Sequence, residues 1–319
     1  MTQTPAFSRR PGGFTLIEMV MVIVITGILS GIVAVFIAEP VEGYVATALR
    51  GNLVDNADLA LRRLSREISL ALPNSVRVTN SGGVIYIEFI PTSGGGGYLS
   101  ESDATAATNP LNYSDVRTCA VRAANCMFDV VGPMPTAPAI AAGDFIVVYN
   151  LGRDADGNSY APADAYLCGA ATVPANCNLA RVAAAPATAA NSTVTLEPGA
   201  GGLNVFAMQS PPLPSPSNRF HVVPGGVQAI TYVCPTVPGS FYRHAGYGIH
   251  AAPATAIAAL TAGNRATIAD NASCVVEYNA AASQRNGVLS VTLTLRDATN
   301  TTNTESVTLM HEIHLDNSP

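Results

Sequence analysis

The segment that decides the fold stands at the N-terminus, where SRRPGGFTLIE at residues 8–18 precedes a run without charge from Met19 to Ala38. An α-helix rises about 1.5 Å per residue, so this uncharged run makes about 30 Å of helix. That length matches the hydrocarbon thickness of a bilayer. The sequence therefore predicts that this segment spans a membrane.

The charges on either side of this segment predict its orientation. Arg9 and Arg10 precede it, whereas Glu39 and Glu42 follow it. By the positive-inside rule, residues 1–13 lie in the cytoplasm. The chain beyond about residue 40 is therefore expected to be exported.

The alternative is a secretory signal peptide, which would end in an A-x-A-like cleavage site after the apolar run. Residues 33–38 match that pattern poorly. Instead, a short basic leader ends at Gly13, an apolar run begins at Phe14, and Glu18 is the fifth residue after the glycine. This arrangement closely resembles the type IV prepilin and pseudopilin family.

The resemblance implies a processing step and an assembly step. A prepilin peptidase is expected to cut between Gly13 and Phe14 on the cytoplasmic side of the bacterial inner membrane, and the new amine of Phe14 is expected to be N-methylated. Glu18 is expected to pair with that amine on a neighbouring subunit. The implied partners are other pilin and minor pilin subunits, the peptidase and the inner-membrane assembly platform. The resemblance places the C-terminal domain first in the periplasm and then in a pilus at the cell surface.

The resemblance extends beyond the leader. Residues 42–79 look like the helical half of the minor pilins of the mannose-sensitive haemagglutinin (MSHA) pilus system, and residues 307–319 look like the end of a biogenesis protein of that system. Residues 91–215 carry almost none of it. The implied function is that of a minor pilin in pilus assembly or initiation. The alternatives are a minor pseudopilin of a type II secretion system and a filament-displayed adhesin or ligand-binding module that uses loops within 94–217.

Composition argues against several other classes. A hydrophobic content of 48% excludes a disordered chain. A formal net charge of -6 and a pI near 5.3, with no basic block, argue against a nucleic-acid ligand. Arg62, Arg63 and Arg66 form a small basic patch without aromatic neighbours, which we interpret as a solvated face or as a source of inter-subunit ion pairs.

The second half of the predicted helix is amphipathic. From Val45 to Leu72 the apolar residues recur at steps of three and four, and Pro73 is expected to end the helix. Pro40 is the first proline after the cleavage site, so any bend is expected there. The predicted divisions are a cleaved leader at 1–13, a membrane-spanning half at 14–38, an amphipathic half at 39–72 and an exported β-rich domain with long loops at 73–319.

Beyond Pro73 the pattern is that of β-strands. A hairpin is predicted from strands at 75–79 and 84–90, which flank Asn80-Ser81-Gly82-Gly83. Further strands are predicted at 144–149, 193–197, 219–223, 227–234, 273–278, 288–296 and 305–315. Stretches rich in Ala, Gly, Pro, Asn and Ser are predicted to be long surface loops, at 94–142, 153–190, 198–217 and 244–272.

These elements predict an α+β fold in which one long N-terminal helix packs its second half on an antiparallel sheet. We also consider two sheets, because the strands of 73–90 and those of 219–315 are separated by the loop-rich middle.

All six cysteines lie beyond residue 118, in the part of the chain that is expected to be exported. No C-x-x-C spacing occurs, and the even number suits an oxidising compartment. The predicted disulfides are Cys119–Cys126, Cys168–Cys177 and Cys234–Cys274, the last bridging neighbouring strands. Six cysteines allow about 15 pairings, so other pairings stay open.

Candidate sites for chemistry are weak. The chain has no G-x-S-x-G elbow, Walker loop, Rossmann fingerprint or H-E-x-x-H motif, so neither an enzyme nor a cofactor is expected. Gly94 to Gly97 lack a following Lys-Ser/Thr and are predicted to be a flexible turn. Gly27 and Gly31 form a G-x-x-x-G motif, a candidate for close helix packing.

Metal binding is the other chemistry to consider. His311 and His314 are three apart on a predicted strand and point to opposite faces, so they cannot share an ion. His311 is expected to be a hydrogen-bonded, buried or half-buried histidine, and His244 and His250 are expected in a solvated loop. A weak calcium candidate comprises Asp154, Asp156, Asn158 and Asp164. Its spacing departs from the EF-hand pattern, so an Asx-rich turn is the preferred interpretation.

Overall fold

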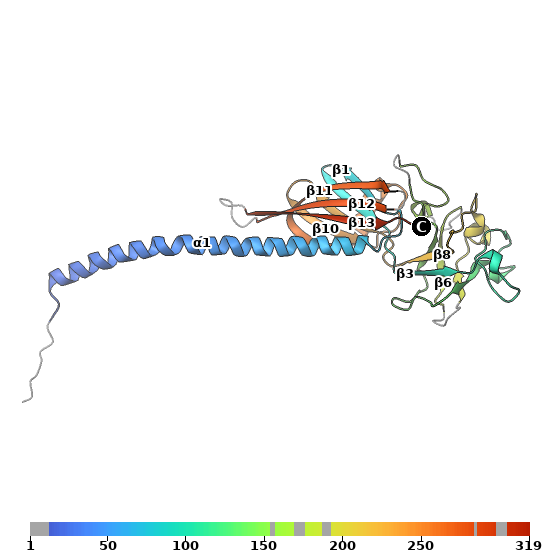
Figure 1. Cartoon of the computed structure of the whole chain (residues 1–319), viewed down its shortest axis with the longest axis horizontal. Coiled ribbons are helices and arrows are strands. Elements are labelled where there is room, and N and C mark those ends of the chain that lie inside the picture. Colours follow the sequence, from blue (N-terminus) through green and yellow to red (C-terminus); the bar gives the residue numbers. More distant parts are fainter. Residues whose placement is uncertain (1–12, 154–156, 169–175, 187–192, 284–285, 298–304) are drawn as a thin grey trace, which may run out of the picture. The chain divides into compact units, whose positions relative to one another are not determined.

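The computed structural model describes residues 13–153, 157–168, 176–186, 193–283, 286–297 and 305–319. The chain divides into two compact units, Met1–Asn52 and Leu53–Pro319 (Figure 1). Helix α1 (Leu16–Ile68) begins in the first unit, continues through Pro40 and ends in the second unit. Every strand of the described residues belongs to the second unit.

Helix α1 ends at Ile68, whereas the sequence predicts an end at Leu72. The reason is that the following backbone bonds to another segment. The N–H of Leu72 donates to the carbonyl of Ile90 at 2.7 Å, and the N–H of Thr92 donates to the carbonyl of Leu70 at 2.8 Å. These bonds replace the last helical turn and connect the end of α1 to the strand that precedes Thr92.

The second unit contains a seven-stranded sheet in the order β1-β2-β9-β10-β11-β12-β13, with every neighbouring pair antiparallel. The predicted hairpin is present, with Gly82 and Gly83 at positive φ in its turn. The bounds are β1 (Arg77–Ser81), β2 (Val84–Phe89), β9 (Ile230–Pro235), β10 (Gly239–Ala245), β11 (Asn264–Ser283), β12 (Asn286–Arg296) and β13 (Ser306–Asp316).

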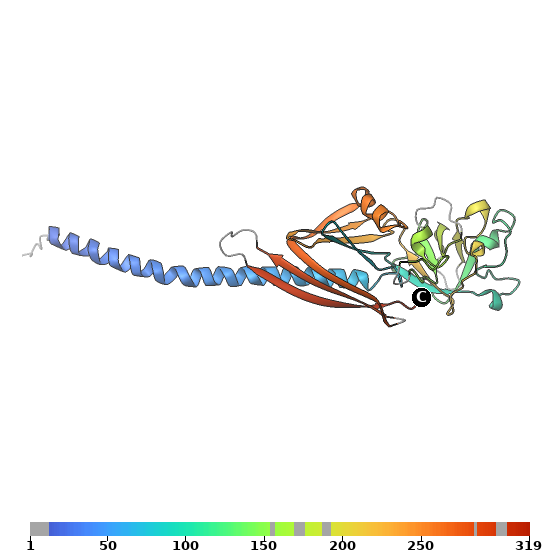
Figure 2. The ribbon, with the colours of Figure 1, turned by 90° about the horizontal axis from the view of Figure 1, so that it is seen from above.

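The second half of α1 packs on this sheet, as the amphipathic pattern predicts (Figure 2). Ala57, Leu61, Leu64 and Ile68 recur at steps of three and four and are buried, so they form one face of the helix. They share a hydrophobic core with side chains of β2, β9, β10, β11, β12 and β13. The α+β architecture predicted from the sequence is therefore confirmed.

A second sheet of the same unit closes into a six-stranded antiparallel barrel in the order β3-β4-β7-β6-β5-β8. The bounds are β3 (Gly94–Tyr98), β4 (Met127–Val131), β5 (Phe145–Val148), β6 (Leu179–Ala184), β7 (Thr193–Leu196) and β8 (Arg219–Val223). The barrel has its own buried aromatic residues, including Phe128 and Phe220 with ring centroids 5.4 Å apart.

The barrel corrects two predictions. Two sheets are present, but the strands of 73–90 join those of 230–316 in one sheet, while the middle of the chain builds the other. The predicted loops at 94–142 and 153–190 contain β3, β4 and β6. Glycine makes up most of β3 and alanine half of β6, so in these two strands the alternation of apolar and polar side chains is as weak as in a loop.

The segment Gly94 to Gly97 is a strand and not a flexible turn. It pairs with β8, and a Cβ on Gly95 would lie 2.6 Å from the carbonyl oxygen of Phe220. A Cβ on Gly96 would lie 3.0 Å from the Phe220 ring. Glycine is thus required here because the two strands approach too closely for a side chain.

The predicted loop at 244–272 is also largely structured, since it contains α3 (Pro253–Ala259) and the start of β11. The remaining helical segments are short. They are α2 (Ala165–Cys168) and the 3₁₀ turns η1 (Glu101–Asp103), η2 (Ala123–Cys126), η3 (Ala200–Gly202), η4 (Phe206–Met208) and η5 (Leu260–Ala262).

Candidate processing and assembly site

The bond between Gly13 and Phe14 lies immediately before the helix. Residues 13–15 are not helical, and α1 begins at Leu16. The Phe14 side chain is 79% exposed, and no atom lies within 4 Å of the position of a Cβ on Gly13. No part of the described chain covers the predicted scissile bond, so a peptidase can reach it.

Thr15 caps the N-terminus of α1. Its side-chain oxygen accepts a hydrogen bond from the N–H of Glu18 at 3.3 Å, and its carbonyl accepts bonds from Glu18 and Met19. Sequence reasoning missed this role, although Thr15-Leu16-Ile17-Glu18 has the S/T-x-x-E spacing of a capping box. The cap fixes where the helix starts relative to the predicted cleavage site.

Glu18 lies in the first turn of α1, where the exposed N–H groups of the helix favour a negative charge. Its side chain is exposed, and among the described residues its carboxylate has no hydrogen-bond or ion-pair partner. The structure therefore leaves this charge available to a group outside the described chain.

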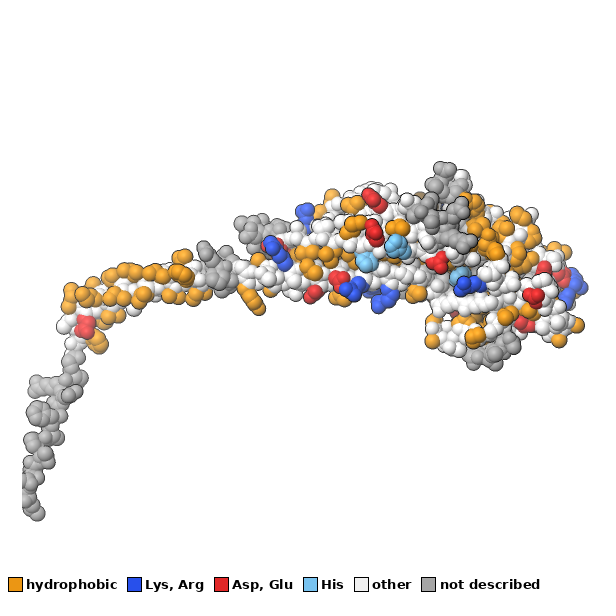
Figure 3. Space-filling view, viewed as in Figure 1, with side chains coloured by type: hydrophobic (Ala, Val, Ile, Leu, Met, Phe, Trp, Pro, Cys, Tyr) orange, Lys and Arg blue, Asp and Glu red, His pale blue; other side chains and the backbone are white. Residues whose placement is uncertain are grey.

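The first unit exposes the apolar half of α1. Leu16–Ile37 has a mean hydropathy of 2.9 over 22 residues and is long and apolar enough to cross a membrane. Its large apolar side chains are 49% to 83% exposed, and Figure 3 shows them along the visible face of this helix. The helix needs lipid or other apolar partners, because water exposure of this surface is strongly unfavourable.

Gly27 and Gly31 lie on this exposed helix, and neither has an atom within 4 Å of an added Cβ. Their face is accessible to another helix. No described residue packs against these two glycines.

Two of the three arginines in the predicted basic patch pair with carboxylates of the same helix. Arg62 contacts Asp58 at 2.6 Å, and Arg63 contacts Glu67 at 3.2 Å. Glu67 also accepts a hydrogen bond from Arg243 of β10 at 2.7 Å, which ties the helix to the sheet. The predicted basic patch is therefore neutralised in large part by neighbouring carboxylates.

The six cysteines form three pairs, Cys119–Cys126, Cys168–Cys177 and Cys234–Cys274, with Cα atoms 5.5 to 5.9 Å apart. This spacing suits a disulfide. The third pair joins β9 and β11, which flank β10, so the strands that it bridges are not hydrogen-bonded neighbours as the sequence analysis expects. The two strands meet at the Gly239 end of β10, since Gly239 pairs with Ala272 of β11 and Tyr242 pairs with Val233 of β9.

His244 and His250 are more buried than predicted, whereas His311 is half-buried as expected. His244 belongs to β10 and is buried, and its Nδ1 donates to the carbonyl of Leu260 at 3.2 Å. The Nε2 of His250 donates to the carbonyl of Tyr247 at 3.0 Å. Neither occupies a solvated loop, because the surrounding segment folds onto the sheet. His311 is half-buried on β13.

Two of the calcium-candidate residues, Asp154 and Asp156, lie outside the described residues. Asp164 is fully buried, and its carboxylate contacts Arg153 at 3.1 Å and accepts a hydrogen bond from the N–H of Tyr166. This ion pair accounts for the Asp164 charge. Among the described residues, no group of three or more His, Cys, Asp or Glu side chains could hold a metal ion.

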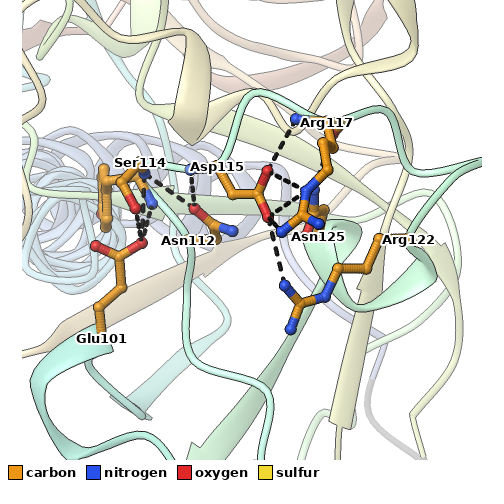
Figure 4. Close-up of polar contacts among 8 residues, drawn as sticks. Glu101, Asn112, Ser114, Asp115, Arg117, Arg122 and Asn125 are labelled. Carbon is orange, nitrogen blue, oxygen red and sulfur yellow. Dashed lines mark hydrogen bonds and ion pairs between the residues drawn. The ribbon is translucent and has the colours of Figure 1, made fainter.

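The richest polar cluster of the barrel surrounds the Cys119–Cys126 pair (Figure 4). Asp115 contacts Arg117 and Arg122, and Asn125 donates to the carbonyl of Arg117 at 2.9 Å. Hydrogen bonds from Arg117 hold the pKa of Asp115 well below its usual range. These contacts connect residues before Cys119 to residues inside the loop that the Cys119–Cys126 pair closes. Their role is structural.

Residues 8–34 match the family described as the prokaryotic N-terminal methylation motif. No curated protein and no solved structure matches the chain. The matched segment contains Gly13, Phe14, the Thr15 cap and Glu18. The N-terminus therefore carries a type IV prepilin-like methylation motif, which supports processing by prepilin peptidase and implies association with other pilins.

Proposed function

We propose that this protein is a minor pilin of an MSHA-type pilus, similar to the biogenesis protein MshO, and that it acts in assembly or initiation. The observation that carries the proposal is the N-terminus. A methylation motif leads into a capped helix whose first 22 residues are apolar and exposed, and Glu18 in the first turn has no partner in the described chain.

The proposed sequence of events follows from these residues. The helix anchors the precursor in the inner membrane with Arg9 and Arg10 in the cytoplasm, and cleavage after Gly13 creates a positively charged amine on Phe14. The unpaired carboxylate of Glu18 then binds that amine on a neighbouring subunit. Because both charges lose water in the apolar surroundings, the pairing lowers the cost of burying each of them.

The architecture of the exported domain supports the role of a minor pilin and not that of a repeating shaft subunit. It holds a barrel in addition to the sheet that packs on α1. We infer a structural rather than a catalytic role, because the polar clusters of the described residues are ion pairs and hydrogen bonds that join segments of the fold. The three cysteine pairs suit export to an oxidising compartment.

The test is processing and incorporation of an epitope-tagged chain in a piliated host that lacks the native protein. Wild-type protein should gain mobility on cleavage and appear in sheared filaments. Gly13→Asp should stay full-length in the membrane, because a charged Cβ substituent enters the peptidase subsite that a glycine leaves open. Mature filament protein whose sequence begins at Met1 would contradict the proposal.

A second candidate function, a filament-displayed ligand-binding module, has one specific observation in its favour. A pocket of about 410 Å³ lies in the barrel, and its lining includes Tyr98, Glu101, Tyr113, Pro212, Pro214 and Asn218. Glu101 is fixed there by hydrogen bonds from the backbone and side chain of Ser114 (Figure 4). The combination of apolar surface with a few fixed polar groups is typical of small-molecule sites.

A further inference from the structure

The barrel is inserted into a connection of the seven-stranded sheet. Phe89 at the end of β2 and Ile230 at the start of β9 are register partners on neighbouring antiparallel strands. The barrel's own ends also meet, since Gly94 of β3 pairs with Val222 of β8. The chain thus leaves the sheet and returns to it at nearly the same place. We define residues 93–226 as the barrel module.

The core between α1 and the sheet contains no residue of the barrel module. Its buried and half-buried members all lie at 53–89 or at 227–315. The module instead packs in a second core, which also takes in residues outside the module, among them Leu72 after α1, Val233 of β9 and Tyr247 after β10. The packing of α1 therefore does not depend directly on the module.

Each cysteine pair lies entirely inside or entirely outside the barrel module. Cys119–Cys126 and Cys168–Cys177 lie inside the barrel module, whereas Cys234–Cys274 lies inside the sheet. No pair crosses from one to the other. The module is also closed, so it presents no free strand edge that the sheet would have to complete.

The polar contacts across the boundary run in both directions, and many of them end on backbone carbonyls. Asn150 donates to the carbonyl of Pro73 at 2.7 Å, and the Tyr166 hydroxyl donates to the carbonyl of Ser75 at 2.8 Å. Water can replace such donors once the carbonyls are exposed. Arg77, which lies over the Tyr166 ring, keeps its 2.7 Å contact with Glu88 inside the sheet.

From this arrangement we propose that assembly uses only α1 and the seven-stranded sheet, and that the barrel module is a separable insertion with a different role, displayed by the filament. This proposal rests on the proposed function, because it assigns the assembly and display roles of a filament subunit to two different parts of the second unit.

The test replaces the barrel module with a short Gly/Ser linker between Thr92 and Val227, with Leu72→Gln and Val233→Thr to make the uncovered surface polar. The variant should be processed and should reach sheared filaments within about twofold of the wild-type level, since the core around α1 is intact. A variant that keeps its circular dichroism and its Cys234–Cys274 bond but is missing from filaments would overturn the proposal.

A second comparison uses the full chain, so that it does not depend on the folding of the deletion. Val116→Arg with Val121→Arg places charges on exposed barrel residues, which are 69% and 75% exposed, and should leave incorporation unchanged. Leu59→Arg, at a 65% exposed position of α1, should reduce it. An equal reduction by both would show that the barrel contacts neighbouring subunits and would refute the proposal. Absence of the wild-type chain itself from filaments would instead contradict the proposed function.

Discussion

At the scale of the residue, the proposed function depends most on Glu18. Its carboxylate stands in the first turn of an exposed apolar helix and has no partner among the described residues. An unpaired carboxylate in a bilayer costs about 2.5 to 3.5 kcal/mol at a helix centre by insertion scales, and less near the end. A partner that removes this cost would also set the axial position of the helix.

Glu18→Ala should leave cleavage after Gly13 largely intact and should strongly reduce recovery in sheared filaments. Glu18→Gln should fail similarly, because a neutral amide supplies no countercharge to the Phe14 amine. The measurement is the ratio of filament protein to mature membrane protein, with Glu312→Gln on the exposed face of β13 as the control. Wild-type recovery of Glu18→Ala would remove the pairing role.

Half-buried His221 and buried His244 make the stability of the second unit sensitive to mild acid. Burial lowers the pKa of His221 and of His244 below the ordinary value of 6.5. The unfolded chain therefore takes up protons first as the pH falls, so the stability present above pH 6.5 decreases below it. The carboxylates Asp115 and Asp129, whose pKa values are lowered, lose their stabilising effect only below their usual pKa near 3.8.

The melting temperature should thus fall between pH 7.5 and pH 5, and His221→Gln together with His244→Gln should flatten that dependence. The exposed His314→Gln serves as the control. If the slope between pH 7.5 and pH 5 survives the double substitution, then these two histidines are not its source.

At the scale of the element, the amphipathic half of α1 belongs largely to the second unit and packs on its sheet. Leu64 is fully buried against the sheet, and Leu59 on the same helix is 65% exposed. Leu64→Ala should destabilise the second unit by about 2 to 5 kcal/mol, because it removes buried methyl groups and leaves a cavity.

Leu59→Ala should change the free energy of unfolding by less than about 0.5 kcal/mol, because it alters only exposed surface. Urea unfolding of the mature protein in detergent, monitored by circular dichroism, measures both variants. Equal destabilisation by the two would contradict the observed packing of the helix face.

The Cys234–Cys274 pair links β9 to β11 across the end of β10, at a sequence separation of 40. In the chain-entropy model, closing a loop of that length is worth about 4 kcal/mol, whereas the loop between Cys119 and Cys126 is worth about 2.4 kcal/mol. Replacing both cysteines of the longer loop with Ala should therefore lower the melting temperature more than the same change at the shorter loop. A free thiol at Cys234 in exported protein would contradict the pairing.

At the scale of the whole molecule, a strain that lacks the chain distinguishes the three candidate functions by its phenotype. Loss of the chain should abolish or strongly reduce piliation if it acts in assembly. Intact pili that no longer adhere would favour the ligand-binding module, and a defect in protein secretion with normal pili would favour a type II pseudopilin. Electron microscopy, an adherence assay and a secretion assay on one strain distinguish these outcomes.

Local chemistry alone determined the N-terminal part of this protein. The patterns that determined it lie within a few residues of one another: an uninterrupted apolar run, apolar residues spaced by three and four, and the glycine before Phe14. The turn at Gly82 and the alternation along β12 are local patterns of the same kind. The Thr15 cap was equally visible as a local pattern. Such features need no information about distant segments.

Only the tertiary structure decided how the middle of the chain folds. Gly94 to Gly97 become a strand because Phe220, more than 120 residues away, approaches their backbone too closely for any side chain. His244 is buried, and its Nδ1 contacts the carbonyl of Leu260 in η5. β1 and β13 belong to one sheet because the chain leaves the barrel at β9, whose Ile230 pairs with Phe89 of β2. These outcomes depend on contacts between distant residues of low local preference, which no short-range pattern encodes.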